Sequence, residues 1–483
     1  MTRFIILLPF LISVAAQSQT DLDLDTYLEA VVTESFGVEL AQSAHQQARS
    51  SYKVFSSEML PQVRLNANLP TYSRTSTSVV QPNGSISFQP LNQNLASVTL
   101  SATQPVGFTG GQLFIEAGLD RFDDFGRSFS QYNGVPFRIG YAQSLVGFNA
   151  YKWQRKIEAS RLNFAEKQKI AAINAAITDA TNLYFNALIA NTNLALAESN
   201  CQLNEKLLIL AEERYQLGKI SLEEKLQMEA EFKLSTLQVA QAKKEVNQAN
   251  LSMSAILMSA PLAKTQLKAP DAFVAKLPSS AELKALAMEN AVDVNLNSLE
   301  LNRWREAAAR RRAENGIQLQ VYAASGLVRS GSQISDIYTS PFSEQQIQAS
   351  ISVPLVDWGR RSAIKSNAKE QVHVAELTLE QTKLNVQSMV DQLILDMEEL
   401  STRLALQSEI LTLSEQRYTI NTERYTAGKI TLTEWVLAQR NRDQAKRDYL
   451  VSLRDFYLAY CTLRSITGYD IRTQSTPTYQ TTK

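Results

Sequence analysis

The residues best placed to do chemistry lie around a ten-residue motif that occurs twice. Glu213–Leu222 and Glu423–Leu432 share the pattern Glu-Arg-Tyr-x-x-Gly-Lys-Ile-Ser/Thr-Leu, at an offset of 210 residues (423 − 213). A glutamate lies two residues beyond each copy, at Glu224 and Glu434. Carboxylates so placed can cap the helix that follows, or attract and repel ions. Repetition at one fixed offset indicates a duplicated structural unit.

The motif also predicts the element that carries it. Gly218 and Gly428 each follow a long helical pattern, and glycine readily adopts the left-handed conformation that ends a helix. Ser221 and Thr431 can cap the next helix, because a glutamate follows each by three residues, which is the capping-box spacing. Each copy therefore predicts two antiparallel helices joined by a tight turn. A well-capped hairpin without any further role is the alternative interpretation.

The rest of the chain shows no motif that is typical of an enzyme's active site. His45 and His373 are the only histidines, and neither has the Cys or His neighbours of a metal site. No P-loop occurs. Lysine and arginine together number 48, as do aspartate and glutamate, and a net charge of zero argues against a nucleic-acid binder. We expect no catalytic residues, no metal, no cofactor and no nucleic acid.

The N-terminus predicts export. Arg3 precedes the apolar run Phe4–Val14, which the small residues Ala15 and Ala16 follow. We expect a signal peptide at residues 1–18, since the run is too short to span a bilayer as a helix. No later apolar run is long enough for a membrane helix, so any crossing of a membrane would use β-strands.

The two cysteines, Cys201 and Cys461, lie in helical patterns at positions that the repeat does not relate. A disulfide framework is therefore not expected to stabilise the protein. We predict two buried thiols, with a single bridge as the alternative.

The hydrophobic patterns predict a helix, strands, a long helix, a turn and a second helix, and this order occurs twice along the chain. Each long helical pattern covers about 66 residues, roughly 100 Å of helix, which suits a coiled coil, a repeat or a tube rather than a globular core. The predicted segments are a first repeat at 19–260, with a helix, strands within 62–146 and a helical hairpin at 150–260; a linker at 261–279; a second repeat at 280–467, with a helix, strands at 317–356 and a hairpin at 359–467; and a loose C-terminal tail at 468–483.

Four strand-like runs are expected in the first half, against two strands in the second. They cover 62–70, 95–104, 112–120 and 137–146, where apolar and polar residues alternate. The intervening segments are rich in Ser, Thr, Asn and Gly and predict long exposed loops.

The tip motif and the strand–helix junctions together resemble the TolC family of outer-membrane efflux proteins. The pattern Arg-Tyr-x-x-Gly-x-Ile at 214–220 and 424–430 resembles the hairpin-tip repeat of that family, and Pro354–Arg361 resembles its strand-to-helix junction. The first-half junction, Gly147–Trp153, is similar to the form in Bacteroidetes relatives. The motif residues are Arg214, Tyr215, Gly218, Arg424 and Gly428 at the tips, and Trp153, Trp358 and Gly359 at the junctions.

The resemblance implies a mainly α fold with a transmembrane β section, internally duplicated. In such relatives three identical chains build one tube: their strands form a shared β-barrel in the outer membrane, and their long helices form an α-barrel through the periplasm. Each half of a relative supplies two strands. We expect the extra pair in this chain to form an extracellular hairpin; the alternative is that it enlarges the barrel. A trimer also suits the strands themselves, because four strands cannot close a barrel and open edges are not stable in lipid.

The resemblance also implies where such a tube would close. Glu224 and Glu434 match positions where relatives carry aspartates that narrow the periplasmic aperture, and Tyr425 matches a tyrosine that helps hold the closed tip. Lys219 and Lys429 could replace part of the salt-bridged lock of some relatives. Capping acids and a packing aromatic are the alternative interpretations for the glutamates and for the tyrosine.

The implied function is an exit duct in the outer membrane, extending into the periplasm. It would be a passive channel with porin activity, opened at its helical tips by a periplasmic adaptor and an inner-membrane transporter of a tripartite efflux pump or type I secretion system. The alternative is that the chain is itself a periplasmic adaptor. Adaptors typically have one hairpin in a β-rich module, so two hairpins and two strand sections favour the duct.

Overall fold

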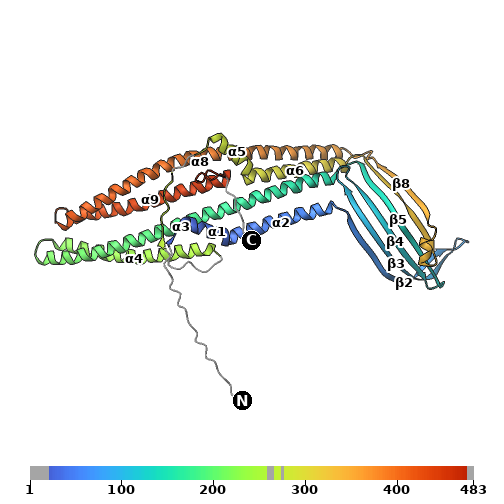
Figure 1. Ribbon diagram of the computed structural model, residues 1–483, viewed down its shortest axis with the longest axis horizontal. Helices are drawn as coiled ribbons and strands as arrows, with labels where there is room; N and C mark the ends of the chain where they lie inside the picture. Colours follow the sequence, from blue (N-terminus) through green and yellow to red (C-terminus); the bar gives the residue numbers. More distant parts are fainter. Residues whose placement is uncertain (1–20, 258–265, 274–276, 476–483) are drawn as a thin grey trace, which may run out of the picture. The chain divides into compact units, whose positions relative to one another are not determined.

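Long helices and long strands make up most of the chain (Figure 1). The computed structural model describes residues 21–257, 266–273 and 277–475, so the expected signal peptide at 1–18 lies outside the described residues. The helices are α1 (Leu24–Glu34), α2 (Phe36–Glu58), α3 (Ala150–Gln216), α4 (Leu222–Ile256), α5 (Ser280–Asn290), α6 (Val292–Glu314), α7 (Ile334–Tyr338), α8 (Arg360–Thr426) and α9 (Leu432–Thr467). The strands are β1 (Asp21–Leu22), β2 (Gln62–Val80), β3 (Ile86–Val106), β4 (Gly111–Asp124), β5 (Phe129–Val146), β6 (Gln266–Leu267), β7 (Gln318–Gly331) and β8 (Phe342–Ser352).

The described residues form two compact units, each of which draws on both halves of the sequence. The compact units therefore do not follow the predicted repeat boundaries. The first, which we call the hairpin unit, takes its residues from 1–43, 168–291 and 386–483, and the second, the sheet unit, consists of 44–167 and 292–385.

The two longest helices confirm the predicted long helical patterns. α3 and α8 contain 67 residues each, and the helices that follow them, α4 and α9, contain 35 and 36. Neither long helix contains proline or glycine, the residues that most readily interrupt a helix. The agreement in length between the two halves is what a duplicated unit would give.

The six long strands form one antiparallel sheet with the order β2-β3-β4-β5-β7-β8. Neighbours in the sheet are also consecutive long strands in the sequence, so the sheet is a meander whose two edges are β2 and β8. One row of directly opposed residues crosses all six strands: Arg64, Ser101, Glu116, Arg138, Gly326 and Glu344.

Successive side chains of a strand point to opposite faces, and this sheet sorts them by polarity. The row from Arg64 to Glu344 lies on the face that we call the polar face. The opposite face, the apolar face, carries a band of aliphatic residues: Val63, Leu65, Ala67, Val98, Leu100, Ala102, Leu113, Ile115, Ala117, Leu119, Ile139, Ile347, Ala349 and Ile351. In the single chain no residue of this band is buried, and Ile347, for example, is 84% exposed.

The strands are longer than the alternation predicts. Loops are expected at 70–90 and 121–136, but β2 continues to Val80, β3 begins at Ile86, and only residues 125–128 join β4 to β5. The prediction of long loops is therefore wrong. Its physical cause is that backbone groups alone make the ladder, so polar side chains on both faces do not prevent strand pairing.

The extra strand pair of the first half belongs to the sheet. Residues 62–73 pair with 93–103, and 93–106 pair in turn with β4. The prediction of a hairpin apart from the other strands is wrong for these segments. Only residues 74–92 extend past β4 as a two-stranded hairpin, which turns at Gly84, where φ is 83°.

Aromatic residues form the centre of the hairpin unit and include part of the predicted linker. The Tyr184 hydroxyl lies 2.8 Å from the carbonyl oxygen of Leu22 and 2.7 Å from that of Lys268, and can donate its one hydrogen to either, where β1 and β6 pair in parallel. Phe273 packs edge-on against Phe456 of α9, with ring centroids 5.0 Å apart. Part of the predicted linker, including Phe273, therefore contacts the hairpin unit.

The predicted loose tail at 468–483 is wrong over its described part, 468–475. Ile471 is only 3% exposed. The Arg472 guanidinium donates to both carboxylate oxygens of Asp25 in α1, at 2.7 and 2.8 Å. A bidentate ion pair and a buried aliphatic side chain hold this segment against α1. The rest of the tail lies outside the described residues.

Both cysteines are free thiols. Cys461 is buried, whereas Cys201 is partly exposed, so the prediction of burial holds for Cys461 only. Burial raises the pKa of the Cys461 thiol. Separately, none of the described helices combines the length and the apolar character needed to cross a membrane.

Candidate functional site

The two tip motifs form the predicted hairpins, and their turns have the same geometry. Gly218 and Gly428 have φ of 67° and 71°. The Lys219 amide donates to the Arg214 carbonyl at 2.8 Å, and the Lys429 amide donates to its Arg424 counterpart at the same distance. A Cβ added to either glycine would meet nothing within 4 Å. The turn therefore requires glycine for its backbone conformation and not for space.

Glu434 acts as a capping acid. Its carboxylate accepts hydrogen bonds from the amide and the hydroxyl of Thr431, both at 2.9 Å, and its own amide donates to that hydroxyl at 3.3 Å. The hydrogen bond from the Thr431 amide is the main cause that lowers the pKa of this carboxyl. The reciprocal pair is the capping box that the spacing predicts.

Glu224 forms only one of the two hydrogen bonds of a capping box. Its amide donates to the Ser221 hydroxyl at 3.1 Å, but its carboxylate makes no return bond among the described residues. Burial is the main cause that raises the pKa of the Tyr425 hydroxyl, and the charge of the Glu224 carboxylate raises it further. The equivalent glutamates of the two repeats therefore differ: one is engaged by its cap and the other is available for other contacts.

Tyr425 is a packing residue of the tip. Only 6% of it is exposed, and its ring stacks on Trp435 with centroids 5.6 Å apart and an interplanar angle of 24°. The Trp435 indole donates to the Thr422 hydroxyl at 3.1 Å. Burial is the main cause that raises the pKa of Tyr425 above its ordinary value of 10. The repeat counterpart, Tyr215, is 36% exposed and carries no such stack.

The two hairpin tips of one chain contact each other. Leu207 and Ala211 of α3 and Met228 of α4 belong to the same buried cluster as Tyr425 and Trp435. We call this the tip cluster.

One polar contact also joins the two tips. The Arg214 guanidinium donates to the Thr426 carbonyl at 3.3 Å. Arg214, Glu224 and Tyr425 are therefore the predicted site residues that the fold brings together. Lys219 and Lys429 are exposed and form no ion pair within the described part of the chain, so a lysine lock has no support within one chain.

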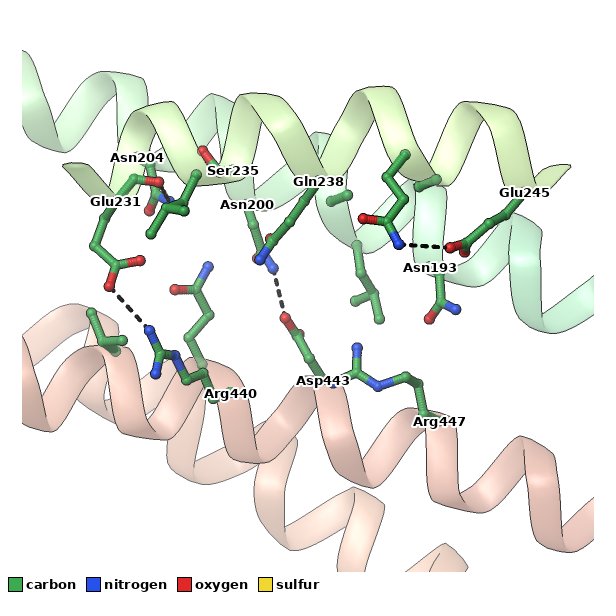
Figure 2. Close-up of a pocket in the computed structure, with 17 residues that line it drawn as sticks. Asn193, Asn200, Asn204, Glu231, Ser235, Gln238, Glu245, Arg440, Asp443 and Arg447 are labelled. Carbon is green, nitrogen blue, oxygen red and sulfur yellow. Dashed lines mark hydrogen bonds and ion pairs between the residues drawn. The ribbon is translucent and has the colours of Figure 1, made fainter. Parts of the chain in front are cut away.

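A polar groove lies behind the tip cluster, between α3, α4 and α9 (Figure 2). It has a volume of about 440 Å³. Asn200 of α3 donates to the Asp443 carboxylate of α9 at 2.6 Å, and Arg440 of α9 contacts the Glu231 carboxylate of α4 at 3.1 Å. These bonds connect the first hairpin to the second.

The groove also contains buried polar atoms without partners among the described residues. The side-chain oxygens of Asn193 and Asn204 are buried and accept no hydrogen bond there. Arg442, whose guanidinium lies 3.9 Å from the Tyr418 ring centroid, bonds both Asp443 and Asn200. A seam of amides and paired charges is easier to hydrate and to separate than an apolar seam of the same size.

Sequence reasoning misses this groove. The apolar positions of α3 indicate its packing face, and Asn200 and Asn204 stand among them four residues apart, on one side of the helix. Two buried asparagines at that spacing are the available signal. Their partner, Asp443, lies more than 200 residues away in sequence, and no local pattern predicts the pairing.

The junction residues lie in the sheet unit. Trp358 is 96% exposed with φ of 51°, and Gly359 has φ of 86°. The Asp357 carboxylate accepts from the amides of Gly359 at 3.1 Å and Arg361 at 2.9 Å, which caps α8. Trp153 lies in the first turn of α3. The junctions thus begin the long helices, and their tryptophans make no buried core.

The comparison with protein families bears on the second half of the chain. Residues 285–469 match the family described as outer membrane efflux protein. The matched residues include the second tip motif and the junction at Pro354–Arg361, so the resemblance predicted from them is confirmed. No protein of the curated set matches the sequence.

Solved structures of outer-membrane channels share the fold over nearly the whole chain. The Campylobacter jejuni CmeC outer membrane channel is 16% identical, with a TM-score of 0.65 over 92% of this chain and 85% of that one. The outer membrane protein VceC of Vibrio cholerae is 15% identical, with a TM-score of 0.64 over 92% and 96%. The Neisseria gonorrhoeae MtrE outer membrane channel, in its open state, is 16% identical, with a TM-score of 0.60 over 94% and 93%.

Proposed function

We propose that this protein is a passive exit duct of the outer membrane, working as a homotrimer in a tripartite efflux pump or a type I secretion system. The observation that carries the proposal is the pairing, in one chain, of a sheet that has an apolar face and two open edges with two helical hairpins that meet at their tips. The match of residues 285–469 to the family described as outer membrane efflux protein supports it.

The sheet accounts for the membrane location. Its apolar face offers aliphatic side chains to lipid, and its polar face would line an aqueous passage. Within the part of the chain that the structure describes, neither β2 nor β8 has a partner on its outer side, and unpaired strand edges are not stable in a bilayer. A single six-stranded sheet is too small to close, because transmembrane barrels have eight strands or more. Several copies must therefore share one barrel.

In the proposed duct, the contact between the hairpin tips would form the gate. In the proposed closed state, the tip cluster and the Arg214 contact hold the two hairpins of a chain together. A periplasmic adaptor, coupled to an inner-membrane transporter, would open the duct by separating the tips. The polar groove behind them provides a hydratable seam along which the hairpins can part. The alternative is a periplasmic adaptor, which typically has one hairpin in a β-rich module; the two hairpins and the sheet of six long strands support the duct instead.

The test is conductance in planar bilayers. Tyr425→Ala removes the ring that stacks on Trp435 and should loosen the tip cluster, so conductance should rise above that of the wild type. Tyr425→Phe is the matched variant: it keeps the stacked ring and should conduct much more like the wild type. A protein that is absent from outer-membrane fractions, or that never conducts, would contradict the proposed function.

A further inference from the structure

We propose that a group of basic side chains, where the helices join the sheet, binds the headgroups of anionic phospholipids. The inference rests on the proposed function, because it takes the apolar face of the sheet to lie in a membrane. It adds which lipid the protein recognises and where. The partner is a phospholipid whose headgroup carries a net negative charge, in the leaflet next to the helices.

The helices α2, α3, α6 and α8 join the sheet at one end (Figure 1). α2 leads into β2 and α6 leads into β7, whereas α3 follows β5 and α8 follows β8. The strand ends concerned, Gln62, Val146, Gln318 and Ser352, all lie at the same end of the antiparallel ladder. The helix segments nearest these strand ends therefore lie next to the membrane in the proposed duct.

These segments are strongly basic. The ten residues of each helix nearest the sheet, at 49–58, 150–159, 305–314 and 360–369, contain four acidic residues: Glu58, Glu158, Glu306 and Glu314. They contain thirteen basic residues, which we call the collar: Arg49, Lys53, Lys152, Arg155, Lys156, Arg305, Arg310, Arg311, Arg312, Arg360, Arg361, Lys365 and Lys369. The collar segments therefore carry a large net positive charge.

The charge of the collar is a local feature. Segments of the same length at the tip ends of α3, α4, α8 and α9, at 207–216, 222–231, 417–426 and 432–441, contain five basic and eight acidic residues. The whole chain has 48 of each. A neutral composition would not by itself give thirteen basic residues against four where the helices meet the sheet.

Most of the collar has no acidic partner within one chain. Arg305 pairs with Glu376 at 2.7 Å and Arg310 pairs with Glu306, but the other eleven side chains form no ion pair within the described residues. All thirteen except Arg311 are exposed. Like charges gathered in this way repel one another, and a bound anion relieves the repulsion. The collar is therefore suited to an anionic partner.

Apolar side chains place the collar at a membrane surface. Leu355 and Trp358, which precede α8, and Phe108, in the turn between β3 and β4, are each at least 88% exposed. The Asn149 side chain donates to the Gly107 carbonyl at 3.0 Å, which holds that turn beside the start of α3. Exposed aromatic and aliphatic side chains next to lysines and arginines are typical of a membrane–water interface. With the apolar face in the hydrocarbon, the collar lies at the level of the headgroups.

One groove in the collar has the composition of a phosphate site. It lies between α6 and α8 and has a volume of about 720 Å³. Arg312 lines it from α6, and Lys365 and Lys369 line it from α8, one helical turn apart. The hydroxyls of Ser362 and Ser366 lie at the same spacing along α8. Ammonium, guanidinium and hydroxyl groups are the donors that bind phosphate oxygens.

Acidic side chains do not neutralise the groove. Glu376 lines it but is paired with Arg305, which leaves Glu370 as the one other carboxylate of its lining. His373, also in the lining, carries no negative charge. A zwitterionic headgroup would add its own cation to this group of cations. We therefore assign the groove to an anionic headgroup, for which phosphatidylglycerol is the probe.

Quenching of tryptophan fluorescence by brominated lipids tests the inference. The full protein is reconstituted into phosphatidylcholine with rising fractions of phosphatidylglycerol, with one of the two lipids brominated at a time. Bromine on the acyl chains quenches nearby tryptophans, so Trp153 and Trp358 report which lipid lies at the junctions. The wild type should favour phosphatidylglycerol by more than about fivefold, the effect of a single cation near an anionic surface. The preference should decline as ionic strength rises.

Substitutions locate the preference in the groove. Arg312→Gln, Lys365→Gln and Lys369→Gln together should remove most of it, because they take away the three cations of the lining. Exchanging the same residues as Arg312→Lys, Lys365→Arg and Lys369→Arg keeps the charges and should preserve it.

The matched control removes three cations elsewhere. Lys206→Gln, Lys244→Gln and Arg403→Gln replace exposed side chains of the hairpin unit that form no ion pair within the described residues. Because these residues lie outside the collar, the preference for phosphatidylglycerol should be that of the wild type.

The outcomes separate this inference from the proposed function. A wild type without the preference, or a control that loses it as fully as the groove variant, overturns the inference and leaves the proposed function intact. Inorganic phosphate that abolishes the preference, where chloride at equal ionic strength does not, overturns the assignment to a lipid. Tryptophans that neither brominated lipid quenches would show that the sheet does not enter the bilayer and overturn both.

Discussion

At the hairpin tips, equivalent residues of the two repeats have unequal surroundings. Tyr425 is buried in the tip cluster and Tyr215 is partly exposed; Glu434 completes its capping box and Glu224 does not. The sequence predicts the caps because capping needs only residues three apart. It does not predict the asymmetry, because the second hairpin supplies Trp435, whose position against Tyr425 depends on packing.

Substitution of Glu434 separates its two candidate roles. Glu434→Gln keeps an oxygen that can accept from Thr431 but removes the charge, whereas Glu434→Ala removes both. A gate ring of carboxylates would make both variants raise conductance and weaken cation preference in planar bilayers at neutral pH. We expect this for both, with an additional loss of tip stability only for alanine. Unchanged conductance and cation preference in both variants would show that Glu434 only caps the helix.

Lowering the pH should destabilise the first turn of α9. The pKa of Glu434 in the folded chain lies below its ordinary value of 4.5. Its contribution to stability is therefore fully present above about pH 4.5 and is lost as pH falls through the folded pKa. Hydrogen-exchange protection of the first-turn amides of α9, corrected for intrinsic exchange, should fall over that window. In Glu434→Gln, which does not titrate, protection that falls in the same way would contradict the assignment.

The helices are the elements best predicted from sequence. α3 and α8 follow from long patterns without proline or glycine, and their ends follow from Gly218 and Gly428. The strands are predicted in number but not in length, because the polar segments near residues 74–92 have no alternation to distinguish them from loops. The groove between α3, α4 and α9 depends on contacts between distant segments and is not predicted.

The stability of the contact between α3 and α9 should depend on the Asp443 carboxylate. This carboxylate is 7% exposed and joins Arg442 to Asn200. Asp443→Ala leaves a mostly buried guanidinium and a buried amide without their partner, which typically costs about 3–5 kcal/mol. Asp443→Asn keeps the shape and one acceptor, so its loss should be smaller. Thermal unfolding of the purified protein measures both, and an alanine variant as stable as the wild type would contradict the assigned role of the seam.

At the scale of the whole molecule, the proposed duct requires several copies of the chain. The sheet exposes aliphatic side chains on one face and open edges at β2 and β8, and both features call for partners that a single chain does not contain. The proposed homotrimer would supply these partners. From the sequence, the expectation of a trimer comes from the resemblance carried by the tip motifs and junctions, and from strands too few to close a barrel. The alternating segments do not specify how many strands each copy contributes.

Electron cryomicroscopy of the protein extracted from outer membranes tests the central claim most directly. We expect particles with threefold symmetry and a continuous central lumen, whose wall in the membrane layer is built from the sheets of three copies. A homogeneous population of single compact chains without a lumen would contradict the account.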